Sequence, residues 1–248
     1  MPACSFPPAP DLVLDALTLR FGAREIFAGL SAVLPGGRCT VLLGTSGVGK
    51  SSLLRIVAGL EQPTAGRVTA ADGAPVRDRV AYMGQRDLLL PWLDVAGNVM
   101  LGDRLRGRRP DRGRAGTLLE RVGLAGRERA LPAQLSGGMR QRVALARTLY
   151  ENRPFVLMDE PFSALDSATR TRMQDLAAEL LRGRTVLLIT HDPLEACRLG
   201  DTLAVLSGHP ARLQERIPIP GPTPRPPDDP ALLAVQGRLM RQLMTEAA

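Results

Sequence analysis

The sequence predicts an α/β fold with a mainly parallel core sheet, an N-terminal antiparallel β subdomain and an inserted helical subdomain. Residues 155–158 and 186–189 are short, uninterrupted apolar runs, which are typical of strands buried on both faces of a parallel sheet. Residues 11–20 and 26–34 instead alternate apolar and polar side chains, as half-buried antiparallel strands do. Polar helical patterns then indicate a helical subdomain at about residues 87–153.

The composition is ordinary for one α/β domain, or for one domain with a subdomain. The chain has 248 residues, of which 44% are hydrophobic and 23% charged, enough for a full core. No apolar stretch approaches the roughly 18 residues of a membrane span, and residues 1–10 lack the features of a secretory signal. We therefore expect a cytoplasmic protein. The three cysteines, Cys4, Cys39 and Cys197, are too scattered to predict disulfides or a zinc site.

The formal net charge of +7 is compatible with a nucleic-acid partner, an anionic membrane surface or an arginine-rich composition. Only residues 104–114 are dense in arginine, and two glycines and a proline interrupt them. Composition is therefore the simpler explanation, and we predict no nucleic-acid partner.

Residues 40–52 have the pattern of a strand, a loop and a helix. Gly44, Gly49, Lys50 and Ser51 match G-x-x-x-x-G-K-[ST], in which glycine N–H groups surround phosphate oxygens. Lys50 is the only lysine among 32 basic residues, and a compact ammonium suits a tight loop better than a guanidinium does. The Ser51 hydroxyl is a candidate Mg²⁺ ligand, and the helix start attracts phosphate. The alternative is a Gly/Ser turn that merely precedes a helix. The candidate ATP-binding residues here are Gly44, Thr45, Ser46, Gly47, Val48, Gly49, Lys50, Ser51 and Ser52.

Two further candidates lie beside predicted strands. Phe21 precedes a Gly22-Ala23 turn and could stack on an adenine ring; the alternative is an ordinary core phenylalanine. Gln85 follows an apolar strand at 79–83, where its amide could ligate Mg²⁺ or hold an attacking water. The alternative for Gln85 is an ordinary surface residue.

Residues 86–93 concentrate four leucines and the only tryptophan in eight positions. Pro91 argues against a buried helix, and an apolar loop that carries a tryptophan is typical of a partner-binding surface. We therefore predict that Leu89, Leu90 and Trp92 contact a partner; the alternative is a loop that faces the core.

A second helix start with exposed N–H groups follows at residues 135–142. Leu135, Ser136, Gly137, Gly138 and Met139 combine a capping serine with two glycines, which indicates another phosphate-binding end. One chain does not obviously bring both helix starts to one phosphate. We therefore hypothesise that a second copy of the chain completes the site.

Polar residues follow both buried runs, where ligands of a parallel sheet gather. Asp159 is a candidate Mg²⁺ ligand and Glu160 a candidate group for activating water; the alternative is a chance acidic pair. His191 follows the strand 185–190 and could donate a hydrogen bond to a terminal phosphate, although a lone histidine is usually structural. Asp166 caps a helix that runs to about residue 182.

Taken together in this order, the motifs resemble the ATP-binding subunits of ABC transporters from residue 11 to about residue 215. By that resemblance, each candidate residue belongs to a named motif of the family. These motifs are the Walker A loop (Gly44–Ser51), the A-loop aromatic residue (Phe21), the Q-loop (Gln85), the signature (Leu135–Met139), the Walker B strand (Phe155–Glu160), the D-loop (Asp166) and the switch histidine (His191). The resemblance implies a head-to-tail homodimer, in which Ser136 to Gly138 of one subunit close on the γ-phosphate held by the other.

Two positions depart from the commonest pattern of that family. Met139 stands where glutamine is usual, and Phe21 where tyrosine is usual. The first departure resembles the nitrate, sulfonate and taurine importers, as do the Leu88–Trp92 run and residues 161–166. The Leu88–Trp92 run also resembles importers of thiamine precursors such as hydroxymethylpyrimidine.

The resemblance implies a Mg²⁺-dependent ATPase that drives uptake of a small solute. Glu160, His191 and Gln85 would be catalytic, and Ser51, Gln85 and Asp159 would hold Mg²⁺. The implied partners are a second ATPase subunit, membrane-spanning permease subunits and, indirectly, an extracytoplasmic solute-binding protein. The implied location is the cytoplasmic face of the inner membrane.

Two other functions remain open from sequence. One is a soluble ABC-type ATPase that acts on nucleic acid or ribosomes, although tandem cassettes or a long coiled coil would then be expected. The other is a P-loop kinase of small molecules, against which the signature argues.

Along the chain we expect a mobile tail (1–10), an ABC ATPase domain (11–216) and a C-terminal extension (217–248). Residues 217–230 are rich in proline and indicate an extended segment with little capacity for a core. Residues 230–246 have an amphipathic helical pattern.

Overall fold

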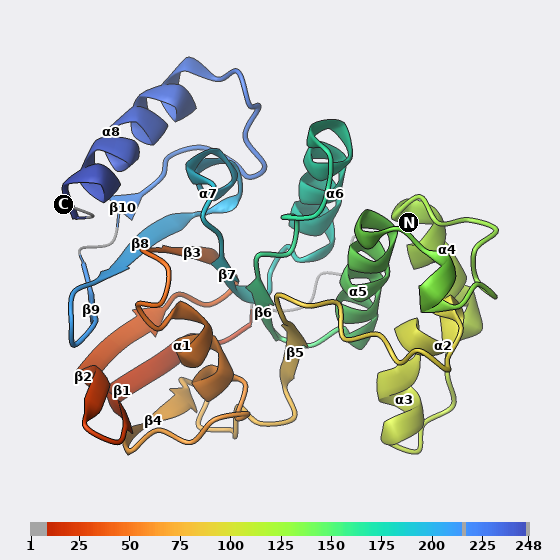
Figure 1. Ribbon diagram of the computed structural model, residues 1–248, viewed down its shortest axis with the longest axis horizontal. Coiled ribbons are helices and arrows are strands. Elements are labelled where there is room, and N and C mark those ends of the chain that lie inside the picture. Colours follow the sequence, from red (N-terminus) through yellow and green to blue (C-terminus); the bar gives the residue numbers. More distant parts are fainter. Residues whose placement is uncertain (1–8, 215–216, 247–248) are drawn as a thin grey trace. The chain divides into compact units, whose positions relative to one another are not determined.

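The computed structural model describes residues 9–214 and 217–246, which divide into two compact units (Figure 1). Of these described residues, the sheet unit comprises 9–80, 154–159, 182–214 and 217–246, and the helical unit comprises Ala81–Arg153 and Glu160–Leu181.

The parallel core of the sheet unit is built from four short strands with buried side chains. These are β3 (Cys39–Leu43), β6 (Phe155–Asp159), β7 (Thr185–Ile189) and β8 (Thr202–Ser207). The strand order is β10-β8-β3-β7-β6-β5, where β5 (Val80–Met83) begins in the sheet unit and β10 (Ile217–Pro218) is antiparallel to β8. Strand β9 (Arg212–Leu213) also pairs with β8. Every residue of β6 and β7 is buried, which confirms the prediction from their apolar runs.

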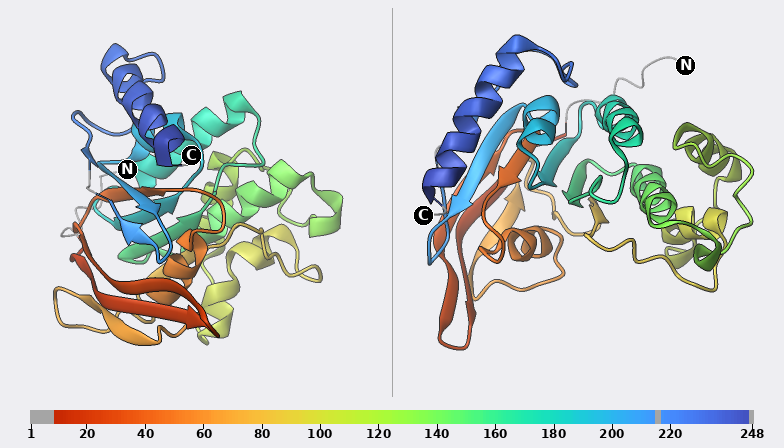
Figure 2. Two further views of the ribbon diagram at one scale, coloured as in Figure 1. Left: turned by 60° about the vertical axis from the view of Figure 1, so that its left-hand side comes forward. Right: turned by 45° about the horizontal axis from the view of Figure 1, so that its top comes forward.

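The antiparallel sheet of the same unit has the order β2-β1-β4 and includes a long hairpin (Figure 2). Its strands are β1 (Leu12–Phe21), β2 (Arg24–Leu34) and β4 (Ala65–Ala70). In β1, Leu12 and Leu14 are buried, and so are Leu17 and Leu19, so the alternation slips by one residue between Leu14 and Leu17. The register shifts at that point and Ala16 has φ 48°. This irregularity, like a β-bulge, keeps all four leucines on the buried face.

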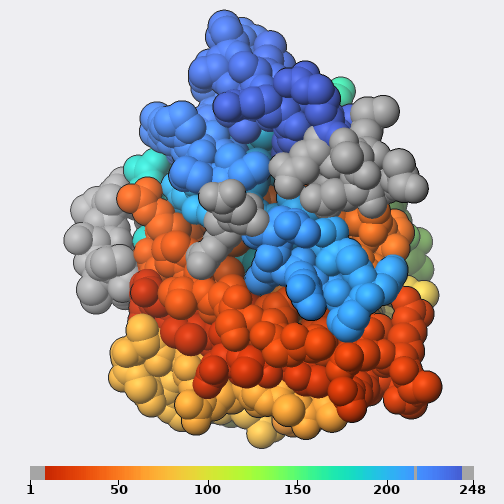
Figure 3. Space-filling view, turned by 90° about the vertical axis from the view of Figure 1, so that its left-hand side faces the viewer, coloured from red at the N-terminus to blue at the C-terminus, as the bar shows by residue number. Residues whose placement is uncertain are grey.

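In its described part, the sheet unit has three helices: α1 (Lys50–Val57), α7 (Pro193–Leu199) and α8 (Pro230–Glu246). Helix α1 packs against β6 and β7 through Leu53, Leu54, Ile56 and Val57, which are buried. Helix α8 packs against α7 and forms part of the surface of the sheet unit (Figure 3, dark blue). Of its apolar residues, Leu232, Val235 and Leu239 are buried.

The Pro-rich segment before α8 is anchored by a buried arginine. Arg225 is 3% exposed, and it donates hydrogen bonds to the carbonyl oxygens of Cys197 and Gly200 at the end of α7. It also donates to the carbonyls of Ile219, Pro220 and Gly221 in its own segment. The segment is therefore part of the packed sheet unit, although its sequence suggested little capacity for a core.

The helical unit contains α2 (Val95–Val99), α3 (Leu101–Leu105), α4 (Arg112–Arg121), α5 (Gly137–Glu151) and α6 (Ser167–Leu180). Helices α2, α4 and α5 pack on one another around buried residues such as Val99, Leu119 and Val143. Asp94, Asp111, Ser136 and Asp166 each cap a helix start by accepting a hydrogen bond from a main-chain N–H group. These caps explain why the helices start where they do.

The structure extends the sequence-based boundaries at several points. The helical unit includes residues 160–181, which lie beyond the expected limit at residue 153. Strands β8, β9 and β10 were not assigned from sequence. The expected tail lies outside the described residues except for Ala9 and Pro10, and the N–H group of Ala9 donates to the Gly183 carbonyl. Within the described residues, no helix is long and apolar enough to span a membrane.

Candidate functional site

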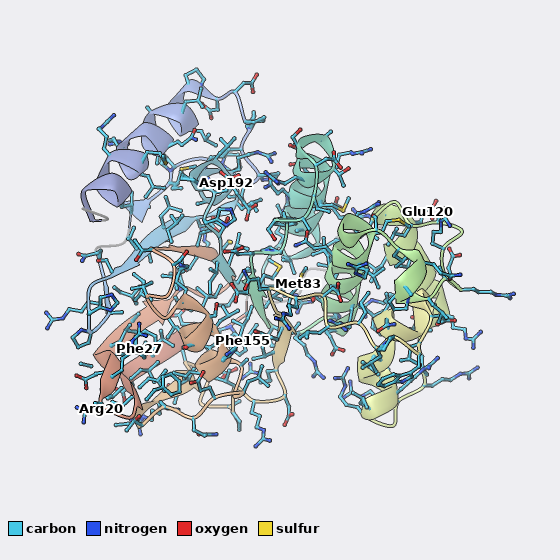
Figure 4. The ribbon with its side chains drawn as sticks, in the orientation of Figure 1. Arg20, Phe27, Met83, Glu120, Phe155 and Asp192 are labelled. Atoms are coloured by element: carbon cyan, nitrogen blue, oxygen red, sulfur yellow. The ribbon has the colours of Figure 1, made fainter. Side chains whose placement is uncertain are left out.

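The loop between β3 and α1 requires glycine at two positions. Gly44 and Gly49 have φ values of 149° and 114°, which side-chain-bearing residues rarely adopt. A Cβ atom at Gly44 would collide with the carbonyl oxygen of Leu206, and one at Gly49 would lie 3.0 Å from the Phe27 ring. Figure 4 labels Phe27, which is fully buried in β2. The core therefore sets the path of this loop.

The same loop combines positive charge with uncapped N–H groups at the start of α1. The Lys50 Nζ atom donates to the carbonyls of Gly44 and Thr45, each at 2.8 Å, so the ammonium lies over the loop. Gly49 is the N-cap of α1, and no side chain caps the first turn. A Cβ atom at Gly47 would meet nothing within 4 Å. The loop thus fits the phosphates of a nucleotide, which such helix starts bind.

The remaining predicted residues of the loop divide between its surface and its interior. Thr45 and Ser46 are exposed, Ser51 and Ser52 are half-buried, and Val48 is buried. The interior position of Val48 helps to fix the loop, and the other four side chains remain accessible to a ligand.

The register of the parallel strands brings the predicted phosphate loop and two predicted residues to one edge of the sheet unit. Leu42 of β3 and Asp159 of β6 both pair with Ile189 of β7. The ends of β3, β6 and β7 therefore lie at the same edge of the sheet. This edge carries the loop after β3, the carboxylate of Asp159 and, just beyond β7, His191. Asp159 is 4% exposed, and His191 is exposed.

Two further side chains of the sheet unit belong to the predicted site or lie next to it in the sequence. Asp192, which is labelled in Figure 4, caps α7. Its side chain accepts hydrogen bonds from the N–H groups of Leu194 and Glu195. This cap fixes the chain next to His191. Phe21, at the end of the β1–β2 hairpin, is 55% exposed, which excludes the core alternative for this ring.

In the helical unit, Gln85 and Glu160 meet directly. Nε2 of Gln85 donates to Oε2 of Glu160 at 3.4 Å. Glu160 has φ 49°, a left-handed conformation that is unusual for a residue other than glycine. Its carbonyl oxygen accepts hydrogen bonds from Gln141 Nε2 at 3.1 Å and from Ser163 Oγ at 3.0 Å. Sequence reasoning did not identify Gln141, because a helical glutamine carries no local sign of a long-range partner.

The start of α5 is capped by Ser136 and packs closely at Gly138. The Ser136 side chain accepts a hydrogen bond from the Met139 N–H group at 3.2 Å, as predicted for the cap. A Cβ atom at Gly138 would lie 3.2 Å from the Ala164 carbonyl oxygen. Leu135 is buried, whereas Ser136 and Gly137 are exposed. The exposed helix start is thus available to a ligand or a partner.

Asp166, the predicted D-loop residue, caps α6. Its side chain accepts a hydrogen bond from the Thr169 N–H group at 3.0 Å. This bond lowers the pKa of the Asp166 carboxyl group below its ordinary value. The carboxylate is therefore charged at neutral pH and stabilises the start of α6.

The loop at residues 86–93 has exposed apolar side chains on a fixed backbone. Trp92 is 72% exposed, which excludes the core alternative for this side chain, and Leu89 and Leu90 are half-buried. The Asn98 amide is buried and bonds to the main chain of Leu90 and Leu93. At the other end of the loop, Arg147 donates to the carbonyls of Asp87 and Leu88. Burial lowers the pKa of the Arg147 guanidinium.

A cavity of about 390 Å³ in the helical unit adjoins this loop. Its lining includes residues from three segments that carry predicted motifs: Gln85, Arg86, Asp87, Leu88, Gly137, Arg140, Gln141, Ser163 and Ala164. Nε of Arg140 bonds to Oδ2 of Asp87 at 3.0 Å. The segment that follows Gln85 and the start of α5 are therefore connected by an ion pair.

Comparison with known proteins gives consistent matches. The model of the ABC transporter family matches residues 27–163. The aliphatic sulfonates import ATP-binding protein of Pseudomonas syringae pv. syringae is 43% identical over 228 residues, which cover 91% of each chain. Its counterpart in Xanthomonas axonopodis pv. citri is 44% identical, with coverage of 90% of this chain and 92% of the relative.

Solved structures resemble the fold as well. The dimeric structure of MJ0796, a bacterial ABC transporter cassette, superposes with a TM-score of 0.76 at 28% identity and covers 85% of this chain and 99% of that one. A second dimeric structure of the MJ0796 cassette, in a post-hydrolysis state bound to ADP and Pi, gives a TM-score of 0.75 at 29% identity, with the same coverage.

Proposed function

The chain belongs to the ABC transporter family, whose ATP-binding subunits are ATPases, and we propose that it drives import of an aliphatic sulfonate through separate membrane subunits. The observation that carries the ATPase assignment is the glycine-rich Gly44–Ser52 loop, where Lys50 Nζ lies over the loop at an uncapped helix start. The names of the relatives favour a sulfonate over the thiamine precursor that Leu88–Trp92 also suggested. Membership of the family also argues against the alternative function of a P-loop kinase that acts on small molecules.

For the chemical step, we propose that the Gly44–Ser52 loop and Lys50 hold the β- and γ-phosphates. Ser51, Asp159 and Gln85 would hold Mg²⁺, which neutralises charge on the phosphates. Glu160 would orient and polarise the attacking water, and His191 would donate a hydrogen bond to the γ-phosphate. These groups would stabilise the charge that develops on the transferring phosphoryl.

We further propose a head-to-tail homodimer as the working form. Exposure of Ser136 and Gly137 at the start of α5 supports this arrangement, because their N–H groups can reach a phosphate bound by another subunit. The dimeric structure of the MJ0796 cassette provides independent support.

The proposed permease contact is the exposed surface formed by Leu89, Leu90 and Trp92. Its fixed backbone, held by Asn98 and Arg147, supports this role because a preorganised loop loses little entropy on binding. The protein would then act at the cytoplasmic face of the inner membrane, and an extracytoplasmic solute-binding protein would deliver the cargo.

Two experiments test the proposal. For the ATPase, Lys50→Ala should weaken ATP binding by about 10- to 100-fold, since a charge-assisted hydrogen bond contributes about 1.5–3 kcal/mol. ATP affinity is measured by calorimetry, and equal affinity in variant and parent would contradict the assignment.

For the cargo, a strain that lacks this gene should fail to grow on an aliphatic sulfonate as sole sulfur source. It should grow normally on sulfate, and a plasmid copy of the parent gene should restore growth on the sulfonate. Normal growth of the deletion strain on sulfonates, with loss of growth on nitrate or loss of thiamine-precursor rescue, would move the assignment to that other solute.

A further inference from the structure

Gln141, in the first turns of α5, connects two segments of the helical unit that are distant in sequence. Its side chain is 7% exposed. Nε2 donates to the Glu160 carbonyl at 3.1 Å and to Ser163 Oγ at 3.3 Å, while Oε1 accepts from the Ala164 N–H group at 2.8 Å. Both ends of the amide are therefore used on the segment that begins with Glu160.

That segment depends on such contacts because Glu160 has an unfavourable backbone conformation. Its φ of 49° lies in a region where a Cβ atom crowds the following carbonyl, and such a residue persists only where its surroundings fix it. The Glu160 carbonyl accepts hydrogen bonds from Gln141 Nε2, Ser163 Oγ and the Ser163 N–H group. Of these donors, only Gln141 comes from another secondary-structure element.

The same segment also contacts the start of α5 at the glycine pair. Gly138 lies so close to the Ala164 carbonyl that an added Cβ atom would be 3.2 Å from it. Gln141 is about one helical turn further on and bonds to the Ala164 N–H group. A displacement of this first turn must therefore displace Ala164, and with it the backbone of Glu160.

We propose that Gln141 is a positioning residue that transmits the position of the Ser136–Gly138 helix start to Glu160. The proposal rests on the head-to-tail dimer proposed above. In that dimer, the helix start faces the ATP of the opposite subunit, whereas Glu160 serves the ATP of its own subunit. Gln141 thereby makes hydrolysis at one site depend on closure at the other.

The chemistry of the amide explains why glutamine is needed at position 141. At neutral pH, the glutamine amide supplies both a donor and an acceptor at this length. Methionine has a similar shape and supplies neither strong group. A glutamate carboxylate accepts only, so it loses the bond to the Glu160 carbonyl, but a protonated glutamate regains a donor in nearly the same geometry.

The experiment compares Gln141→Met and Gln141→Glu with the parent and with Gln174→Met, a matched change at a glutamine of α6 that is 3% exposed. We expect Gln141→Met to lower kcat at least 10-fold, with KM for ATP changed less than 3-fold. When Gln141→Met is combined with Glu160→Gln, ATP-dependent dimer formation should stay within 3-fold of that of the Glu160→Gln protein alone. Gln174→Met should keep most of the parental kcat, and the melting temperature of both variants is measured beside it.

The pH profile distinguishes positioning from a purely structural role. Burial raises the pKa of a carboxyl group, so the activity of Gln141→Glu relative to the parent should rise as the pH falls from 8 to 6. The charged groups around position 141 are Glu160 and, along the cavity, Arg86, Asp87 and Arg140. All of them are present in the parent, so normalisation to the parent at each pH removes their own titration.

The outcomes separate the two proposals. A folded Gln141→Met protein with parental kcat would overturn the role of Gln141, and so would a flat relative pH profile of Gln141→Glu. Equal losses of kcat in Gln141→Met and Gln174→Met would show an effect of folding alone and would overturn it too. If Glu160→Gln alone fails to dimerise with Mg²⁺-ATP, the head-to-tail dimer fails, and the transmission role of Gln141 fails with it.

Discussion

The amide nitrogen of Gln85 lies 3.4 Å from a carboxylate oxygen of Glu160, so the neutral Q-loop side chain directly contacts the proposed catalytic carboxylate. A hydrogen bond of this length is weak. Gln85 can therefore exchange this contact for a water or a cation at small cost in free energy. The pair therefore supports a role for Gln85 in which its side chain responds to the occupancy of the site at Glu160.

The proposed role of Glu160 predicts a specific kinetic effect of Glu160→Gln. Turnover should fall at least 100-fold, because positioned acid–base groups contribute about 10²- to 10⁴-fold, while ATP affinity should stay within a few fold. The uncleaved ATP should also hold the dimer closed. Turnover is measured by phosphate release, and oligomeric mass by light scattering with and without Mg²⁺-ATP. Parental turnover would remove Glu160 from the mechanism.

The packing of the phosphate loop predicts a stability difference between two glycine substitutions. Gly49→Ala should lower the free energy of unfolding by about 1–3 kcal/mol, because φ is 114° and the methyl group meets Ile26 and Phe27. Gly47→Ala has a positive φ as well but nothing within 4 Å, so its loss should be smaller. Urea unfolding of both variants measures the difference, and equal losses would show that the contact with Phe27 is unimportant.

The exposed loop predicts separable effects on assembly and hydrolysis. Trp92→Ala should leave basal ATP hydrolysis within about 2-fold, yet it should weaken permease binding by about 2 kcal/mol or more, as at other tryptophan hot spots. Co-purification with the permease subunits measures assembly. Leu60→Ala is a suitable control, because Leu60 is 64% exposed and lies in the sheet unit. Normal co-purification of folded Trp92→Ala would place the contact elsewhere.

The buried guanidinium of Arg225 predicts that the C-terminal segment stabilises the sheet unit. Arg225→Met should lower the free energy of unfolding by about 3 kcal/mol or more, because it removes donors from five carbonyl oxygens. Limited proteolysis should then cut within residues 217–230 faster than in the parent. Arg238→Met, at an exposed position of α8, is the control. Unchanged stability and proteolysis would show that the segment is not anchored by Arg225.

The local patterns of the chain were sufficient to predict the elements that depend on neighbouring residues. The apolar runs of β6 and β7, the strand–loop–helix pattern of residues 40–52 and the cap at Ser136 agree with the structure, because each depends on only a few consecutive side chains. The predicted end of α6 near residue 182 and the predicted bounds of α8 also agree with the structure within about two residues.

The pairing of distant residues required the tertiary structure. The bond between Gln141 and Glu160 joins positions 19 residues apart, and the bonds of Arg225 reach back to Cys197, 28 residues earlier. Neither glutamine nor arginine shows its partner in the local sequence, since many partners are chemically equivalent for an amide or a guanidinium. The chain by itself therefore determined which chemical groups are present and on which elements they lie. Packing decided which of them meet, because only the folded backbone brings donors and acceptors within hydrogen-bonding distance and excludes water from them.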